Sequence, residues 1–151
     1  AVLDVATLAA QATLAGLLLR HNGDPESLNL DTWPRLHRFV EDTVVVGHNI
    51  AFDMRFFAAA GPRCGVSFAN PILDTLLLEC AINANHEDKS LGAIAQRLGL
   101  SVTGRHTALG DALSTAEIFI ALIPLLAEGG ISSLGDALRT CRESPLARLT
   151  G

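Results

Sequence analysis

The sequence predicts a helix-rich α/β domain with a small parallel or mixed sheet. Two short runs that suit buried strands, TVVVG at 43–47 and PILDT at 71–75, each lead directly into a helical segment. The first run is rich in β-branched residues, which is typical of strands covered on both faces. With 151 residues and 49% apolar content, the chain has room for one domain with a core, but not for two.

The first predicted helix covers residues 5–19, VATLAAQATLAGLLL, with Asp4 as its N-cap. This segment is apolar nearly all round, but it contains Gln11 and is shorter than the roughly 20 residues that span a bilayer. We therefore interpret it as a buried helix and predict no membrane anchor.

A turn-rich stretch at 21–33, which includes NG and DP dipeptides, predicts a loop. Pro34 then suits the first turn of a short helix over 34–42. The predicted apolar stripe of this helix consists of Leu36, Phe39 and Val40. Trp33 is expected to pack beside Pro34.

Five further helices follow from periodicity and capping residues. They are predicted at 50–60, ended by Gly61 and Pro62; at 75–83; at 90–98, between Ser90 and Gly99; at 107–127, disturbed near Pro124; and at 133–142, begun by a capping box of Ser133 and Asp136. The chain is accordingly divided into an N-terminal helix and loop (1–33), a core (34–128) and a C-terminal helix and tail (129–151).

Charge and cysteine usage narrow the class of protein. The net charge of −5 argues against a protein that binds nucleic acid through a broad basic face, although it leaves room for a nuclease with a local channel. Cys64, Cys80 and Cys141 are widely spaced and odd in number, which predicts reduced thiols in the core of a cytoplasmic protein. Since the chain does not open with Met or a basic leader, we expect it to be a fragment without a signal peptide.

Three residues suit phosphodiester hydrolysis by two metal ions, which needs converging carboxylates and a base for the attacking water. Asp53 is predicted in the first turn of a helix beyond a strand end, where α/β sheets place ligands. Asp111 is predicted one turn inside the long helix, with His106 on the preceding loop. A histidine pKa near 6.5 lets this side chain accept a proton at neutral pH.

These residues stand in two segments that resemble motifs of a known family. GHNIAFDMRFF at 47–57 resembles the second motif of the DEDDh 3′–5′ exonucleases, the group of the epsilon subunit of DNA polymerase III, and GRHTALGDALSTAEIF at 104–119 resembles their third, H-x-A-x-x-D. ILDTLLLE and SLGAIAQRLGL follow in the family's order, so the resemblance covers about 36–126. It implies a ribonuclease H-like fold, Asp53 and Asp111 as ligands of two Mg²⁺ or Mn²⁺ ions, and His106 as general base.

Two related classes do not fit the residues. The tyrosine-based sister group uses a Tyr four residues before its last Asp, and this chain has no tyrosine. An HD-type phosphohydrolase needs a His-Asp dipeptide, which the sequence does not contain.

The family's first motif, Asp-x-Glu on an opening strand, has no good counterpart. Asp24 and Glu26 flank Pro25 in a turn, and the meander that follows the motif needs roughly 35–40 residues, more than separate Glu26 from Asp53. Asp4 has Ala6 where Glu belongs. We therefore expect the N-terminal side of the sheet to be missing, and metal binding to be weak or absent, since Asp53 and Asp111 alone cannot offset two divalent ions.

The other conspicuous side chains have plainer interpretations. Phe52, Phe56 and Phe57 are most simply core residues, although Phe52 is also the candidate for stacking on a terminal base, and Arg105 is the candidate for a phosphate. His48 and Asn49 are expected to shape the turn through local hydrogen bonds. Asp74 at a strand end is expected to be structural.

The leading interpretation is a 3′–5′ exonuclease that acts on single-stranded or 3′-terminal DNA, inactive as this fragment alone, and associated with a DNA polymerase or another domain of a longer protein. Two alternatives stay open: a degenerate module that binds a partner or nucleic acid without cleavage, and an exonuclease of short RNA. An uncovered sheet edge would also favour a homodimer.

Overall fold

The computed structural model describes residues 32–101 and 107–148. The predicted helix over 5–19 and the Asp-x-Glu candidates Asp4, Asp24 and Glu26 lie outside these residues, as do Arg105 and His106. The elements are α2 (Thr32–Val40), β1 (Val45–Gly47), α3 (Ala51–Ala60), the 3₁₀ turn η1 (Gly61–Cys64), β2 (Ile72–Asp74), α4 (Thr75–Ile82), α5 (Leu91–Arg97), α6 (Ala108–Glu128), α7 (Leu134–Glu143) and the 3₁₀ turn η2 (Pro145–Arg148).

The two predicted strands are present and pair in parallel. Val45 lies opposite Ile72 and Gly47 opposite Asp74, so both strands end at the same edge of the sheet. The connection between them runs through α3, as parallel pairing requires. The α/β prediction is confirmed for the described part of the chain, with each strand two residues shorter than its predicted run.

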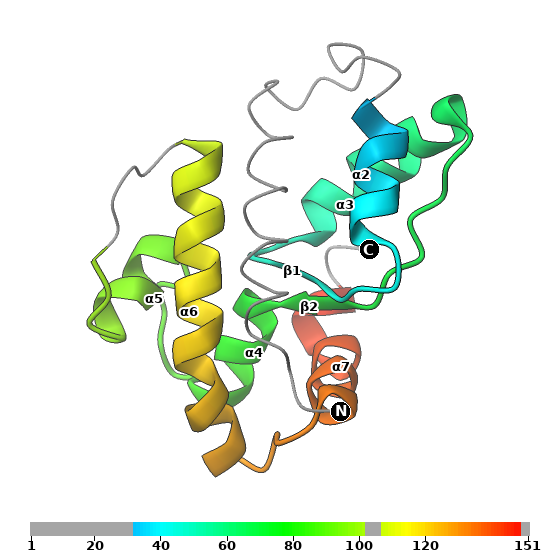
Figure 1. The fold of residues 1–151 in the computed structure, drawn as a ribbon. Helices are drawn as coiled ribbons and strands as arrows, with labels where there is room; N and C mark the ends of the chain where they lie inside the picture. The colour runs from blue at the N-terminus through cyan, green and yellow to red at the C-terminus, as the bar shows by residue number, and fades with distance from the viewer. Residues whose placement is uncertain (1–31, 102–106, 149–151) are drawn as a thin grey trace.

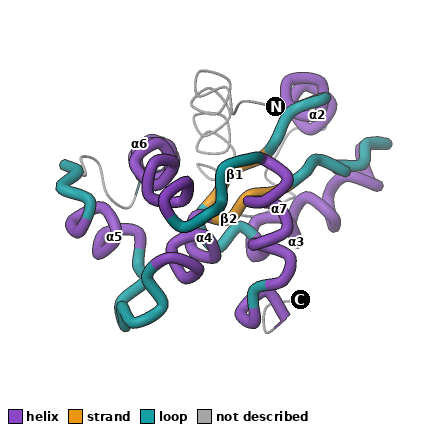
Figure 2. Tube along the Cα trace, turned by 90° about the horizontal axis from the view of Figure 1, so that it is seen from below, coloured by secondary structure: helices purple, strands orange, loops and turns teal. Residues whose placement is uncertain are grey.

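Helices cover this small sheet on several sides (Figures 1 and 2). In Figure 1, α5 and α6 lie to one side of the strands and α2 and α3 to the other, with α4 and α7 below. Helix α6 packs on β1, α7 packs on β2, and α4 contacts both of these helices. The side chains buried at their junction include Leu73, Leu78, Ile94, Ile118, Phe119 and Leu122.

A second cluster joins α2 to α3. Trp33, Leu36 and Val40 are buried and follow one face of α2, where Trp33 packs edge-on against Phe57 and Phe68. The prediction that Trp33 is a packing residue is confirmed. The prediction for Phe39 is wrong: its side chain is 49% exposed, because it projects about 90° away from the buried stripe at 100° per residue.

Capping residues end the helices largely as predicted. Ser90 accepts a hydrogen bond from the amide of Ala93, and Gly99 takes a φ of +71° after α5. Ser133 and Asp136 form the predicted capping box at the start of α7. Helix α6 continues past Pro124, which lies on the exposed side of the helix.

Helix α6 is also long and apolar enough to cross a membrane by length and composition, over Gly110–Glu128. Half of this segment is buried within the protein, where Ile118 and Phe119 belong to the main core.

The three cysteines are free thiols, as predicted. Cys141 is buried against β2, whereas Cys64 and Cys80 are half-buried at the margins of the core. The expectation that all three are core residues is therefore met in full by Cys141 alone.

Candidate active site

The candidate site begins where β1 turns into α3. Gly47 ends the strand, and a Cβ at this position would lie 2.6 Å from the Ile50 side chain, so the turn needs glycine for its close approach. Asn49 takes a φ of +54°, a conformation that asparagine tolerates better than most residues. The chain therefore reverses within three residues and enters α3 directly at Ala51.

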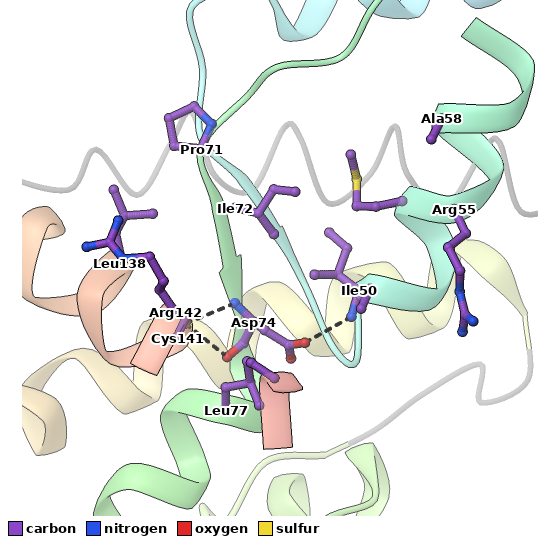
Figure 3. Close-up of a pocket in the computed structure, with 13 residues that line it drawn as sticks. Ile50, Arg55, Ala58, Pro71, Ile72, Asp74, Leu77, Leu138, Cys141 and Arg142 are labelled. Atoms are coloured by element: carbon purple, nitrogen blue, oxygen red, sulfur yellow. Dashed lines mark hydrogen bonds between the residues drawn. The ribbon is translucent and has the colours of Figure 1, made fainter. Parts of the chain in front are cut away.

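The carboxylate of Asp74 anchors this turn. Its Oδ1 accepts hydrogen bonds from the amides of Asn49 and Leu76, both at 2.9 Å. Its Oδ2 accepts one from the amide of Ile50 at 3.1 Å (Figure 3). Asp74 thus caps α4 while it fixes the start of α3. Burial raises the pKa of this carboxyl, although the three amides and His48 oppose that shift. The prediction that Asp74 is structural is supported by these contacts.

His48 joins the turn to two later segments. Its Nε2 lies 3.0 Å from the carbonyl oxygen of Lys89, and its Nδ1 lies 2.9 Å from the hydroxyl of Thr75. A carbonyl accepts, so Nε2 carries a proton. The Thr75 hydroxyl also donates to the carbonyl oxygen of Gly47 at 3.2 Å, so in the neutral ring Nδ1 shares the single Thr75 proton with that carbonyl. His48 shapes the site as expected, but it does so through contacts distant in sequence rather than local ones.

We expect His48 to titrate below 6.5, the ordinary pKa of histidine, because its burial disfavours the charged ring more than Asp74 and Glu79 favour it. Because the pKa of His48 is lower in the folded protein than in the unfolded chain, the neutral ring contributes to the stability of the fold above about pH 6.5. This contribution is lost as the pH falls toward the lowered pKa of the folded protein. Histidine NMR titration measures the pKa, and urea unfolding at pH 7 and 5 measures the loss. A His48 pKa at or above 6.5 would contradict the assignment, and His48→Gln should flatten the pH slope.

Asp53 lies in the first turn of α3, as predicted. Its side chain is half-buried. Burial raises the pKa of the Asp53 carboxyl, which its own backbone amide opposes and the charge of Asp74 reinforces. A desolvated carboxylate beside a second negative charge is a group that gains from a bound cation.

Asp111 lies in the first turn of α6, slightly nearer the start of the helix than the predicted position one turn inside it. Thr107 caps this helix, and its hydroxyl accepts from the amide of Gly110 at 3.1 Å. Thr115 donates its hydroxyl proton to the Asp111 carbonyl at 2.8 Å. The Asp111 backbone is therefore held in regular helix, on the element that packs against β1.

These two carboxylates are oxygen ligands of the kind that Mg²⁺ and Mn²⁺ prefer. Within residues 32–101 and 107–148, no group of three or more His, Cys, Asp or Glu side chains gathers into a metal site. The described residues therefore offer two donors of the right chemistry, while the general base predicted from sequence, His106, lies outside them.

An aromatic and cationic patch flanks Asp53 on α3. Phe52 is 53% exposed, packs edge-on against Phe56 at 5.2 Å between centroids, and has the Arg55 guanidinium 5.5 Å from its ring centre. The interpretation of Phe52 as a core residue is wrong, since the buried face of α3 is taken by Phe57 and Ala60. An exposed ring beside a cation remains suited to stacking on a base.

Sequence reasoning missed an ionic group behind the site. Glu79 is 1% exposed on α4, where it pairs with Arg97 at 3.1 Å and with His86 at 3.4 Å. The amide nitrogen of Asn83 donates to the same carboxylate at 3.1 Å. No periodicity marks this group, because its members come from a helix, a loop and the next helix. It ties α5 to α4 near the carbonyl of Lys89 that His48 contacts.

Comparison with known proteins identifies the family. The exonuclease family model, RNase_T, matches residues 22–119, which is more than half of the chain. The chain belongs to this exonuclease family, and its small parallel sheet with flanking helices is consistent with the ribonuclease H-like fold. No solved structure matches it.

Individual relatives are replication proteins. A DNA polymerase III subunit epsilon-like protein from Rhodobacter capsulatus is 40% identical over 111 residues, which cover 72% of this chain and 16% of that protein. DNA polymerase III PolC-type proteins from Caldanaerobacter subterraneus and Thermotoga maritima are 29% and 32% identical, over 83% and 68% of this chain. The chain spans 9% and 8% of those two proteins, so it matches one region of much longer polypeptides.

Proposed function

We propose that this chain is the nuclease region of a metal-dependent 3′–5′ exonuclease that removes nucleotides from the 3′ end of DNA. The observation that carries the proposal is the placement of Asp53 and Asp111. Each stands in the first turn of a helix, one directly after β1 and the other on the helix that packs against β1. The match to the exonuclease family model and the similarity to the epsilon-like protein support the proposal.

In this proposal Asp53 and Asp111 hold two divalent ions, Mg²⁺ or Mn²⁺, together with carboxylates outside the described residues. Bound ions of this kind neutralise charge on the phosphate and lower the pKa of an attacking water. The half-buried position of Asp53 keeps its carboxylate poorly solvated, which favours exchange of water for a cation.

Three further roles complete the proposal. His106, which precedes α6 in the sequence, accepts the proton of the attacking water. Arg105 beside it contacts a phosphate of the strand. Phe52 stacks on the terminal base, which its 53% exposure permits.

The test uses the natural full-length protein and a single DNA strand labelled at its 5′ end. In Mn²⁺ or Mg²⁺ we expect a ladder that shortens from the 3′ end, and EDTA should abolish it because the reaction depends on the ions. A ladder produced from the 5′ end, or digestion that resists EDTA, would contradict the proposal. An RNA strand of the same sequence serves as the competing substrate, since preference for short RNA is the neighbouring alternative.

The second candidate is a module that binds nucleic acid or a protein without cutting it. The sequence Asp24-Pro25-Glu26 favours this candidate, because it is a poor substitute for the family's first motif. Binding of the labelled strand without digestion, in either metal, would support it.

We further propose a DNA polymerase as partner and the bacterial cytoplasm as the place of action, from the replication proteins among the relatives.

A further inference from the structure

A groove of about 660 Å³ lies between α3, β2 and α7 (Figure 3), and Asp53 is not among the residues that line it. Met54 and Ala58 of α3 and Ile50 at its N-cap line the groove, and these three residues recur every four positions. The volume falls within the range of natural ligand pockets, about 300–1,000 Å³. Neither candidate metal ligand of the described chain lines it, but Ile50, Arg55 and Asp74 do, so the groove adjoins the candidate active site without containing its carboxylates.

The floor and walls of the groove are mostly apolar. Met54, Ile72, Leu77 and Leu138 line it, and all four side chains are half-buried rather than fully enclosed. The groove is open to solvent. A partner could therefore remove further apolar surface from water without any opening of the fold.

The charges at the groove have one sign. Among its lining residues, the exposed charged side chains are Arg55 on α3 and Arg142 on α7, while the carboxylate of Asp74 is buried and already bonded to three amides. The exposed charge at the groove is therefore positive, whereas the whole chain has a net charge of −5. Within the described residues, neither arginine takes part in an ion pair.

From this arrangement we propose that the groove binds an acidic amphipathic helix of a protein partner. Its apolar stripe would pack on Met54, Ile72 and Leu138, and carboxylates on both flanks would pair with Arg55 and Arg142. Two arginines on opposite helical walls suit a ligand with charges on both sides of an apolar stripe, which is the helix-in-groove mode of recognition. Guanidinium groups bind carboxylates through paired hydrogen bonds.

The test is a charge-swap experiment with three helical peptides of about 15 residues, near the length at which isolated helices gain stability. All carry the same leucine stripe, flanked by Glu, Gln or Lys. Fluorescence anisotropy should rank their affinities Glu, then Gln, then Lys, with roughly tenfold loss of Glu-peptide binding per arginine replaced by Gln. The double variant Arg55→Glu with Arg142→Glu should prefer the Lys peptide, whereas Arg38→Glu on the exposed side of α2 should preserve the original order.

Met54 reports occupation of the groove directly, because it is the single methionine of the chain. Its ¹³C-labelled methyl resonance, identified by its disappearance in Met54→Leu, should shift on addition of the Glu peptide and remain in place with the double variant. Equal affinity for the Glu and Lys peptides would overturn the proposal, as would binding that leaves Met54 unperturbed. A shift caused by dodecanoate but not by the Glu peptide would also overturn it, in favour of a small amphiphile. None of these readouts depends on nuclease activity.

Discussion

Replacement of Asp53 or Asp111 by Asn should slow digestion of a DNA 3′ end by a factor on the order of 1,000, which corresponds to about 4 kcal/mol of transition-state stabilisation. Asparagine keeps the shape of aspartate but removes the negative charge that would hold a divalent ion. The rate is measured on the 5′-labelled strand with full-length protein at saturating Mn²⁺ or Mg²⁺. Because both residues belong to one proposed site, the double variant should be little slower than either single variant.

The fold itself should survive these substitutions. Burial raises the pKa of Asp53, so at neutral pH the ionised form costs stability that a neutral amide does not. We therefore expect Asp53→Asn to melt no earlier than the parent protein in EDTA, which separates loss of activity from loss of structure.

Asp42→Asn is the matched control. Asp42 is exposed and takes a φ of +60°, which asparagine adopts readily, so this variant should digest DNA at the parent rate. If Asp111→Asn also digests at the parent rate, the assignment of the site is wrong.

Local patterns were enough to predict most of the described elements. The predicted runs at 43–47 and 71–75 both contain strands, because a short apolar segment that leads into a helix has few other ways to bury itself. Ser90, Gly99 and Ser133 act as helix ends because caps depend on neighbours three or four residues away. The first-turn positions of Asp53 and Asp111 followed from those boundaries.

Contacts between distant segments could not be predicted in this way. The hydrogen bonds from Asn49 and Ile50 to Asp74 join residues 25 and 24 positions apart, and the groove between α3 and α7 depends on how two helices are placed on β2. The predicted burial of two aromatic side chains was wrong for the same reason. Phe39 and Phe52 are apolar, but each lies off the face that its helix buries. Hydrophobicity alone does not say which of several aromatic residues faces the core.

Asp74→Ala should lower the free energy of unfolding by about 3 kcal/mol, because it leaves three inward-facing amides without their acceptor, at roughly 1 kcal/mol or more each. Two of these amides belong to the turn that orients α3, and the third starts α4. The same variant should also lose exonuclease activity, since Asp53 stands only one turn beyond the freed amides. Urea unfolding measures the stability change, and the 5′-labelled strand measures the activity.

Asp74→Asn separates the hydrogen bonds from the charge. Its amide oxygen can replace Oδ1 and keep the bonds from Asn49 and Leu76, but its NH₂ group then faces the amide of Ile50 with a donor against a donor. Its loss of stability should therefore be smaller than that of Asp74→Ala. As a control, Asp88→Ala removes an exposed carboxylate that accepts the amide of Ser90, and it should cost far less than either. Equal stability of Asp74→Ala and Asp88→Ala would mean that Asp74 does not anchor the turn, and the position of Asp53 would then need another cause.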